Sequence, residues 1–330
     1  MTCARVRQVF GDLTVPVIAA PMFLVSTPQL VIAACKAGII GAIPAANART
    51  PAEFAGWIES VSSELEAFER ETGRRPAPFA VNIPVHAPDD AARAALEAHL
   101  DTCRRFRPGL LITVYGDPSP VVGVAREWGG KVIHDVTNIR HARKAIAAGV
   151  DGLVLIASGG GGHSGTLNPF VFVSEVRRIF DGIVVLAGGM ADGAAVLAAE
   201  ALGADLCYMG TRFIATQESG AADDYKQMIV DAGSADVIYT PFFSHGVPAM
   251  MLRPSIERWG YDPDNLPPVP GPGDPVLTAK PWKDIWAAGQ SVSLIDDVPT
   301  VKALVARIAE EYATARAGLG LGTGLNDVNV

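Results

Sequence analysis

The 330-residue sequence predicts an α/β protein, a (β/α)8 barrel of the TIM type with a smaller, mostly helical cap domain. Eight short apolar runs alternate with amphipathic stretches along residues 1–216. The runs are continuously apolar, which is typical of parallel strands buried on both faces. Three connections also repeat one design, in which a helix ends at a glycine and a strand follows. A doubly wound open sheet of eight strands is the alternative architecture.

Each predicted element has its own signal. The strands are short runs rich in valine, isoleucine and leucine, at residues 15–19, 39–43, 79–82, 110–114, 131–134, 152–156, 183–187 and 206–209. The helices between them are expected at residues 27–37, 51–72, 89–105, 118–128, 138–148, 170–180 and 193–202. The helix at 51–72 has the clearest start, because Thr50 can cap it, Pro51 fits its first position and Glu53 completes a capping box.

The chain divides into three predicted parts. Residues 1–216 are expected to form the barrel and to bind a cofactor. Residues 217–299 hold a proline-rich connector at 267–275 and three of the five tryptophans, and we expect a helical cap or substrate domain there, packed on the barrel mouth. Residues 300–330 contain an amphipathic helix at 301–319 that closes the barrel, followed by a flexible glycine-rich tail.

Composition and charge exclude several classes of function. The chain has 27 basic and 35 acidic residues, a net charge of −8, which argues against nucleic-acid and anionic-membrane partners. Residues 13–35 lack charge, but three prolines and a polar cluster interrupt them, so we expect no membrane span. The four cysteines lie far apart without metal-site spacing, and we see no signal peptide. We therefore expect a cytoplasmic protein with reduced thiols and no metal.

Three glycine-rich segments follow the sixth, seventh and eighth predicted strands, where barrel loops carry active sites. Residues 159–162 are four successive glycines, so a flat ligand or a phosphate can lie against backbone N–H groups there. Gly188 and Gly189 follow the seventh strand, and Gly210 and Thr211 follow the eighth, in the loops that commonly bind phosphate. Together the segments predict a cofactor that carries a phosphate group.

Other residues near the predicted barrel mouth add candidates. His163 is the titratable side chain of the first glycine segment, and it can accept or donate a proton near neutral pH. Residues 160–165 also fit the G-x-G-x-x-G pattern of dinucleotide sites, although this match lies in mid-chain and contains the histidine. The Ala-Pro-Met turn at 20–22, after the first strand, and Asn82, at the end of the third, can line a pocket for a flat ring.

The ordered set of motifs resembles a known family. The segments APM, FAVN, VIHDVTNIRHARKAIAAGVDGLVL, GGGGHSG, AGGMADG and GADLCYMGTRF, with WAAGQ and IDDVP further on, are together similar to the nitronate monooxygenase family, formerly called 2-nitropropane dioxygenase. That family includes flavin-dependent enoyl-ACP reductases and NADH:quinone reductases of the same build. The resemblance covers roughly residues 10–216 and the two later segments.

The resemblance implies an FMN-dependent oxidoreductase that oxidises alkyl nitronates or nitroalkanes with O2. It implies that His163 is the catalytic base, which removes a proton next to the nitro group. The FMN phosphate would lie on Gly188, Gly189, Gly210 and Thr211, and the flavin ring near Ala20, Pro21, Met22, Asn82 and Gly161. The cofactor supplies the electron transfer, and the protein supplies position and electrostatics.

The sequence departs from the family pattern at three places. Ser158 and the four glycines stand where many members have Glu and Ala before the glycines. Asp135 stands where some members have a lysine close to the flavin phosphate, and a carboxylate cannot neutralise a phosphate. Residues 165–172 form a longer connection than a minimal turn and can reshape the substrate mouth.

Several other side chains have two interpretations. We expect His86 in an exposed loop, His134 in the core and His141 on the surface, while His245 is a candidate second pocket residue. Tyr239 and Trp286 either stack on substrate or pack internally.

Two other functions stay open at this point. One is an NAD(P)H-dependent flavin reductase that acts on a quinone, an enoyl thioester or a CoA thioester. The other is a flavin-free barrel that binds a sugar or nucleotide phosphate. In each case the partner is a small molecule, and the chain can form a homodimer.

Overall fold

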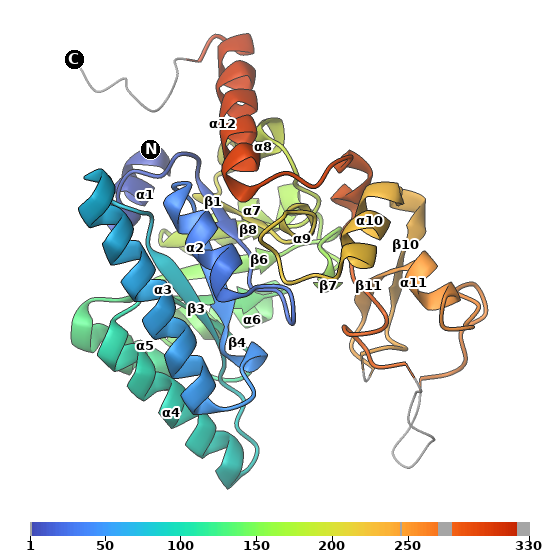
Figure 1. Cartoon of the computed structure of the whole chain (residues 1–330), viewed down its shortest axis with the longest axis horizontal. Helices are drawn as coiled ribbons and strands as arrows, with labels where there is room; N and C mark the ends of the chain where they lie inside the picture. The colour runs from blue at the N-terminus through green and yellow to red at the C-terminus, as the bar shows by residue number, and fades with distance from the viewer. Residues whose placement is uncertain (1, 245, 270–278, 322–330) are drawn as a thin grey trace.

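The computed structural model describes residues 2–244, 246–269 and 279–321, and its centre is a closed barrel of eight parallel strands (Figure 1). The order is β1-β2-β3-β4-β5-β6-β8-β9, and β1 pairs with β9, with Val17 opposite Cys207, so the sheet closes on itself. The strands are β1 (Val17–Ala19), β2 (Ile40–Pro44), β3 (Phe79–Pro84), β4 (Leu110–Val114), β5 (Lys131–Val136), β6 (Gly152–Ile156), β8 (Ile183–Ala187) and β9 (Leu206–Met209). The TIM barrel is confirmed and the open sheet is excluded.

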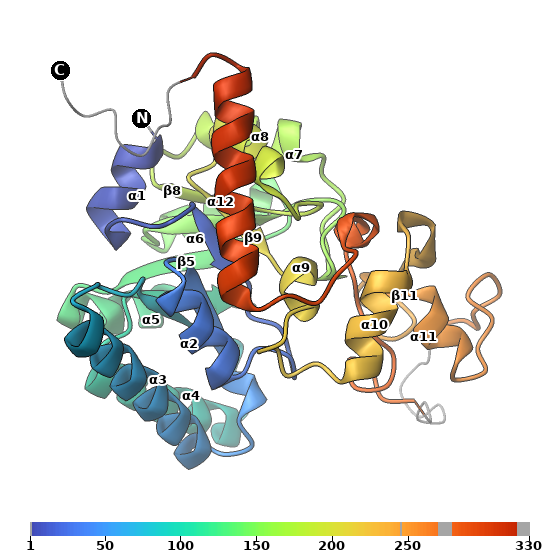
Figure 2. The same ribbon diagram turned by 45° about the horizontal axis from the view of Figure 1, so that its top comes forward.

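The helices form a layer outside the barrel (Figure 2). They are α2 (Pro28–Lys36), α3 (Pro51–Thr72), α4 (Asp90–Phe106), α5 (Ser119–Ala125), α6 (Ile139–Ala147), α7 (Pro169–Arg177), α8 (Gly193–Leu202) and α12 (Val301–Gly318). The predicted helices at 51–72 and 193–202 agree to the residue, and Thr50 caps α3 as expected. The predicted helix at 118–128 ends in a 3-10 turn, Arg126–Trp128. The C-terminal helix α12 packs on α2 and α8 and completes the outer layer.

The barrel interior is filled by alternate residues of the strands. Ile18, Ile112 and Val185 are fully buried in this interior cluster. The residues next to them on each strand point the other way and face the helices. The structure adds a helix that was not predicted, α1 (Thr2–Phe10), whose residues Val6 and Phe10 join the interior cluster and close one end of the barrel. The other end, at the carboxyl ends of the strands, is left for the site.

The cap contains two short helices and also a small sheet that we did not predict. Its helices are α10 (Asp223–Asp231) and α11 (Arg253–Glu257), which follow the short α9 (Thr211–Ile214). Its sheet has the antiparallel order β10-β11-β7, formed by Val237–Thr240, Ala249–Leu252 and Gly162–His163. Strands of two to four residues give too little periodicity to be recognised in a sequence. The third strand comes from the barrel loop after β6, so this sheet joins the barrel to the cap.

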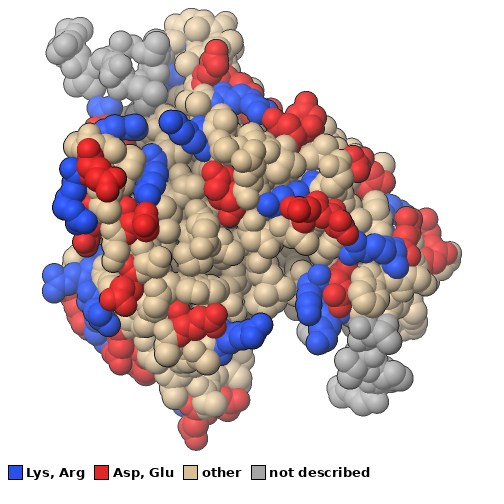
Figure 3. Space-filling model, in the orientation of Figure 1, with Lys and Arg blue, Asp and Glu red and all other residues tan. Residues whose placement is uncertain are grey.

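The surface carries charges of both signs. On the face shown in Figure 3, basic and acidic side chains are interspersed. Across the described residues, no helix has both the length and the apolar character needed to cross a bilayer. Cys35, Cys103 and Cys207 are buried free thiols. His245, the end of the proline-rich connector and most of the C-terminal tail lie outside the described residues.

Candidate active site

A cavity of about 1390 Å³ opens at the carboxyl ends of the barrel strands and extends under the cap. Ligand pockets commonly measure about 300–1,000 Å³, so this cavity has room for a cofactor and a substrate together. All ten residues expected to bind the flavin or to act as the base line it. These residues are Ala20, Pro21, Met22, Asn82, Gly161, His163, Gly188, Gly189, Gly210 and Thr211. The structure therefore brings the candidates together, while their roles stay predictions.

His163 is held by the sheet that joins barrel and cap. It lies in β7, opposite Ala249 of β11, and its Nδ1 lies 2.9 Å from the hydroxyl of Tyr115. The indole of Trp282 packs against its ring edge-to-face, with ring centroids 5.1 Å apart. Its Nε2 is buried and has no hydrogen-bond partner among the described residues. One ring nitrogen is thus fixed by the protein, and the other is available for a ligand.

Burial lowers the pKa of His163 below its ordinary value of 6.5. The imidazole is therefore neutral at pH 7, as a general base must be. If Nδ1–H donates to Tyr115, Nε2 keeps its lone pair free to accept a proton. Tyr115 itself has a left-handed backbone with φ of +57°, an unusual conformation for a residue other than glycine. It directly follows β4, at the same barrel edge as the other candidates.

If His163 is the base that the sequence resemblance implies, this pKa shift predicts the pH dependence of proton removal. Because the active form of a base is the neutral one, kcat/KM for a nitroalkane should then stay constant on acidification down to a pH below 6.5 and fall only beneath it. A pH profile of kcat/KM, measured with both a nitroalkane and its nitronate, checks this. The nitronate profile should lack this limb, since no proton has to be removed from it.

The glycine loops are shaped first by their own close packing. A Cβ on Gly188 would lie 2.6 Å from the carbonyl oxygen of Ser158, and one on Gly161 would lie 2.8 Å from the amide nitrogen of Gly289. These two glycines let neighbouring loops touch through their backbones. Gly189 is different: its φ is +72°, and a Cβ there would meet no atom within 4 Å. Its surroundings are open cavity, as expected where a ligand group lies against backbone.

Thr211 connects the barrel to a loop of the cap segment. Its hydroxyl oxygen accepts a hydrogen bond of 2.9 Å from the amide of Gly289, within the WAAGQ segment. The hydroxyl proton stays available to a ligand, because the oxygen is the acceptor in this contact. A Cβ on Gly210, the preceding residue, would contact the Met22 sulfur at 3.6 Å, an ordinary packing distance.

Three polar side chains form the cavity floor, at interior-facing positions near the carboxyl ends of their strands. Asn82 donates through Nδ2 to the carbonyl of Ile112 at 3.3 Å. Asp135 on β5 and Tyr208 on β9 also line the cavity, and Oδ1 of the first and the hydroxyl of the second are buried without a partner in the described chain. Burial raises the pKa of Asp135 to about 8, and it also raises the pKa of Tyr208 well above the ordinary tyrosine value of 10.

The remaining candidates separate into lining and packing residues. His86, His141 and Tyr239 line the cavity, so His141 is not simply a surface residue. His134 is buried as expected: its Nδ1 lies 2.8 Å from the Thr113 hydroxyl, and burial lowers its pKa to about 4. Trp286 packs internally, stacked on Tyr225 with centroids 4.7 Å apart.

Sequence reasoning missed Tyr115, Tyr208 and Trp282 as site residues. Tyr115 and Tyr208 lie at or next to the carboxyl ends of barrel strands, so the rule that placed Asn82 could have identified them. Trp282 lies in an irregular part of the cap, and only the fold brings it to His163.

Comparisons with known proteins agree on one family. The sequence profile described as "Nitronate monooxygenase" matches residues 8–311. A nitronate monooxygenase of Paraburkholderia phytofirmans is 26% identical over 90% of this chain and 92% of its own length. A (3aS,4S,5R,7aS)-5-hydroxy-7a-methyl-1-oxo-octahydro-1H-indene-4-carboxyl-CoA dehydrogenase of Mycobacterium tuberculosis is 29% identical over 72% of this chain and 63% of its own. The crystal structure of a nitroalkane oxidase from Streptomyces ansochromogenes superimposes with a TM-score of 0.75 and 25% identity, over 95% of this chain and 99% of the other.

Proposed function

The chain is an oxidoreductase that belongs to the nitronate monooxygenase family, and from this premise we propose that it oxidises alkyl nitronates and nitroalkanes with O2 through a bound FMN. The observation that carries the proposal is His163, with one ring nitrogen fixed by Tyr115 and the other unpartnered in a cavity that also holds the glycine loops. A neutral base with an unpartnered nitrogen beside a cofactor site is what removal of a proton next to a nitro group requires.

The residues fit a flavin mononucleotide. Gly188, Gly189, Gly210 and Thr211 would hold its phosphate through backbone N–H groups and one hydroxyl, and the open space at Gly189 supports this. The ring would lie near residues 20–22, Asn82 and Gly161. When bound, the flavin supplies the transfer of electrons between substrate and O2.

The protein's own part is to take a proton. A nitroalkane placed with its acidic C–H toward Nε2 of His163 loses that proton to the neutral imidazole, and the hydroxyl of Tyr115 stabilises the cation that forms. Trp282 packs edge-to-face with the imidazole and helps to hold its orientation. A nitronate has already lost this proton, so it reaches the same state without the base.

A second candidate function is reduction or oxidation of a CoA or enoyl thioester, with NAD(P)H as the other substrate where a reductant is needed. The similarity to a carboxyl-CoA dehydrogenase favours it, as does a cavity larger than a small nitroalkane requires. The same histidine can then act on a proton next to a thioester carbonyl.

Absorbance spectra separate these functions. Purified protein of the proposed kind is yellow, and released cofactor co-elutes with FMN; a colourless protein that takes up no added FMN contradicts the proposal. Under anaerobic conditions, a nitronate should bleach the flavin of a nitronate monooxygenase, and NADH or NADPH should not. Bleaching by a reduced nicotinamide or a CoA thioester alone supports the second candidate.

Replacement of Tyr115 by phenylalanine tests how His163 is positioned. We expect kcat/KM for a nitroalkane to fall about 5- to 10-fold, which corresponds to one hydrogen bond of about 1 kcal/mol, with little change for the nitronate. The acid limb of the pH profile should move as well, because the hydroxyl contacts Nδ1. A fall of equal size for both substrates would instead indicate a general effect on the cavity.

A further inference from the structure

Two polar groups on the cavity floor take no part in the proposed proton transfer. Asp135 lies two residues after the interior residue Ile133 on β5, and Tyr208 lies two residues after Leu206 on β9. Both side chains therefore face the barrel interior, at its mouth. The Oδ1 atom of Asp135 and the hydroxyl of Tyr208 are buried, and neither has a hydrogen-bond partner in the described chain. Buried polar atoms are nearly always partnered, so these two indicate a ligand that completes them.

The surroundings of Asp135 keep its carboxyl group uncharged. Tyr115 and Tyr208 are the titratable groups that face it, and their own burial, followed by the negative charge of Asp135, raises the pKa of both. Its neighbour β6 and the next strand, β8, are entirely apolar, whereas His141 and Lys144 of α6 line the same cavity. Among the described residues no ion pair involves Asp135, and burial raises its pKa to about 8.

We propose that Asp135 acts as a neutral carboxylic acid and, together with Tyr208, donates hydrogen bonds to an acceptor on the ring of the bound flavin. This inference rests on the proposed flavin site. A flavin ring carries neutral acceptors, its carbonyl oxygens and ring nitrogens, that suit two uncharged O–H donors. The phosphate does not suit them, because any ionised fraction of the carboxyl would repel it.

The arrangement makes flavin affinity depend on the proton of Asp135. The protonated acid donates to the ring, whereas the carboxylate repels the ring's acceptor atoms, so flavin binds with full affinity below the pKa of Asp135 and progressively more weakly above it. Burial raises the pKa of Tyr115 and Tyr208 above the ordinary tyrosine value, and it lowers the pKa of His163 below the ordinary histidine value. Between pH 7 and 9, Asp135 is therefore the group of this set that titrates.

The experiment is flavin binding by the apoprotein as a function of pH, followed by quenching of flavin fluorescence. Riboflavin is used beside FMN, because it lacks the phosphate, which has a titration of its own near pH 6. Loss of one bound proton raises Kd tenfold per pH unit above the pKa, so we expect Kd for riboflavin to be about tenfold higher at pH 9 than at pH 7.

Two variants complete the test, with thermal unfolding to check that each is folded. Asp135→Asn keeps the size and a donor but cannot ionise, so its Kd should be constant between pH 7 and 9. Tyr208→Phe should weaken binding about fivefold at every pH and keep the pH dependence. A wild-type Kd that is independent of pH, or a pH dependence that Asp135→Asn retains, overturns the inference. Failure of the wild type to bind either flavin at any pH overturns the proposed function instead.

Discussion

Replacement of His163 by asparagine is expected to lower kcat/KM for a nitroalkane by about 10²- to 10⁴-fold, the usual contribution of a general base. Asparagine retains a side chain that can contact Tyr115, but it has no basic nitrogen to take the substrate's proton. Turnover of the corresponding nitronate should change by less than about tenfold, because that substrate needs no base. The contrast between the two substrates is the readout.

Steady-state assays with a nitroalkane and with its preformed nitronate measure this contrast directly. His86→Asn is a matched control, because His86 lines the same cavity but follows a different strand, and it should alter neither rate more than about threefold. Flavin content must be equal in the three proteins. Equal losses for nitroalkane and nitronate in His163→Asn would show that the residue shapes the cavity rather than removes the proton.

Replacement of Gly193 by alanine is expected to lower the free energy of unfolding by about 3 kcal/mol. Gly193 is the first residue of α8 and packs against the backbone of α12. A Cβ there would lie 2.1 Å from the amide nitrogen of Tyr312 and 2.3 Å from the carbonyl oxygen of Ile308. A backbone cannot rotate away as a side chain can, so the two helices must separate.

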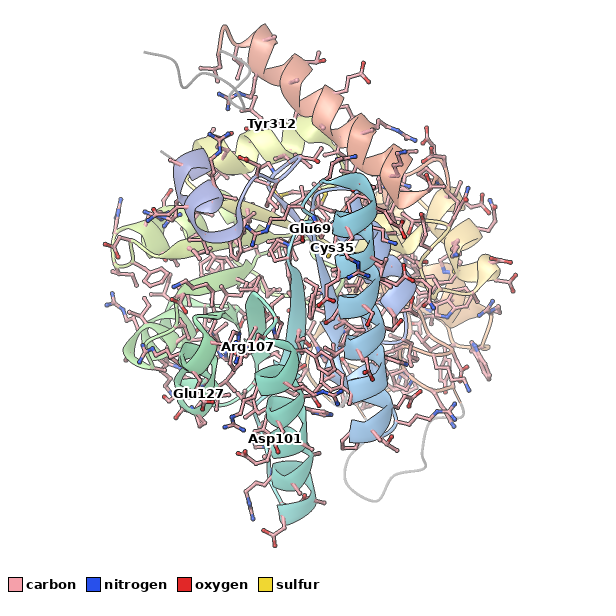
Figure 4. All side chains as sticks on the ribbon, turned by 60° about the vertical axis from the view of Figure 1, so that its left-hand side comes forward. Cys35, Glu69, Asp101, Arg107, Glu127 and Tyr312 are labelled. Carbon is pink, nitrogen blue, oxygen red and sulfur yellow. The ribbon has the colours of Figure 1, made fainter. Side chains whose placement is uncertain are left out.

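This separation would also disturb polar contacts between the helices. The amide of Gly193 donates to Glu311 at 2.9 Å, and the hydroxyl of Tyr312, on the face of α12 toward α8 (Figure 4), donates to Glu200 at 2.5 Å. Chemical denaturation measures the loss. Gly56→Ala is the control, since Gly56 lies exposed in α3 and a Cβ there would meet no atom within 4 Å, and it should stabilise by about 0.5–1 kcal/mol. A neutral Gly193→Ala would mean that α12 is loosely attached.

Local sequence signals are strong where an element is long or fully buried. The eight barrel strands and the helix at 51–72 were predictable because continuous apolar runs, capping residues and post-helix glycines depend only on neighbours in the chain. The same logic found the glycine loops and His163, since barrel loops carry active sites at the carboxyl ends of strands. The helix α1 was missed because its apolar residues Val6, Val9 and Phe10 span little more than one turn, which is too short to distinguish a helix from a loop.

Taken alone, the sequence determined the barrel, the order of its strands along the chain, and the glycine loops and His163 at its mouth. Only the tertiary structure decided which other residues lie there and which of them meet. It placed Tyr115 on one nitrogen of His163 and Trp282 against its ring, and it left Asp135 and Tyr208 buried without partners among the described residues. The physical reason is that secondary structure follows from contacts a few residues apart. A hydrogen bond, a burial or a shifted pKa arises instead from residues far apart in the chain, which only the closed barrel and its cap bring together.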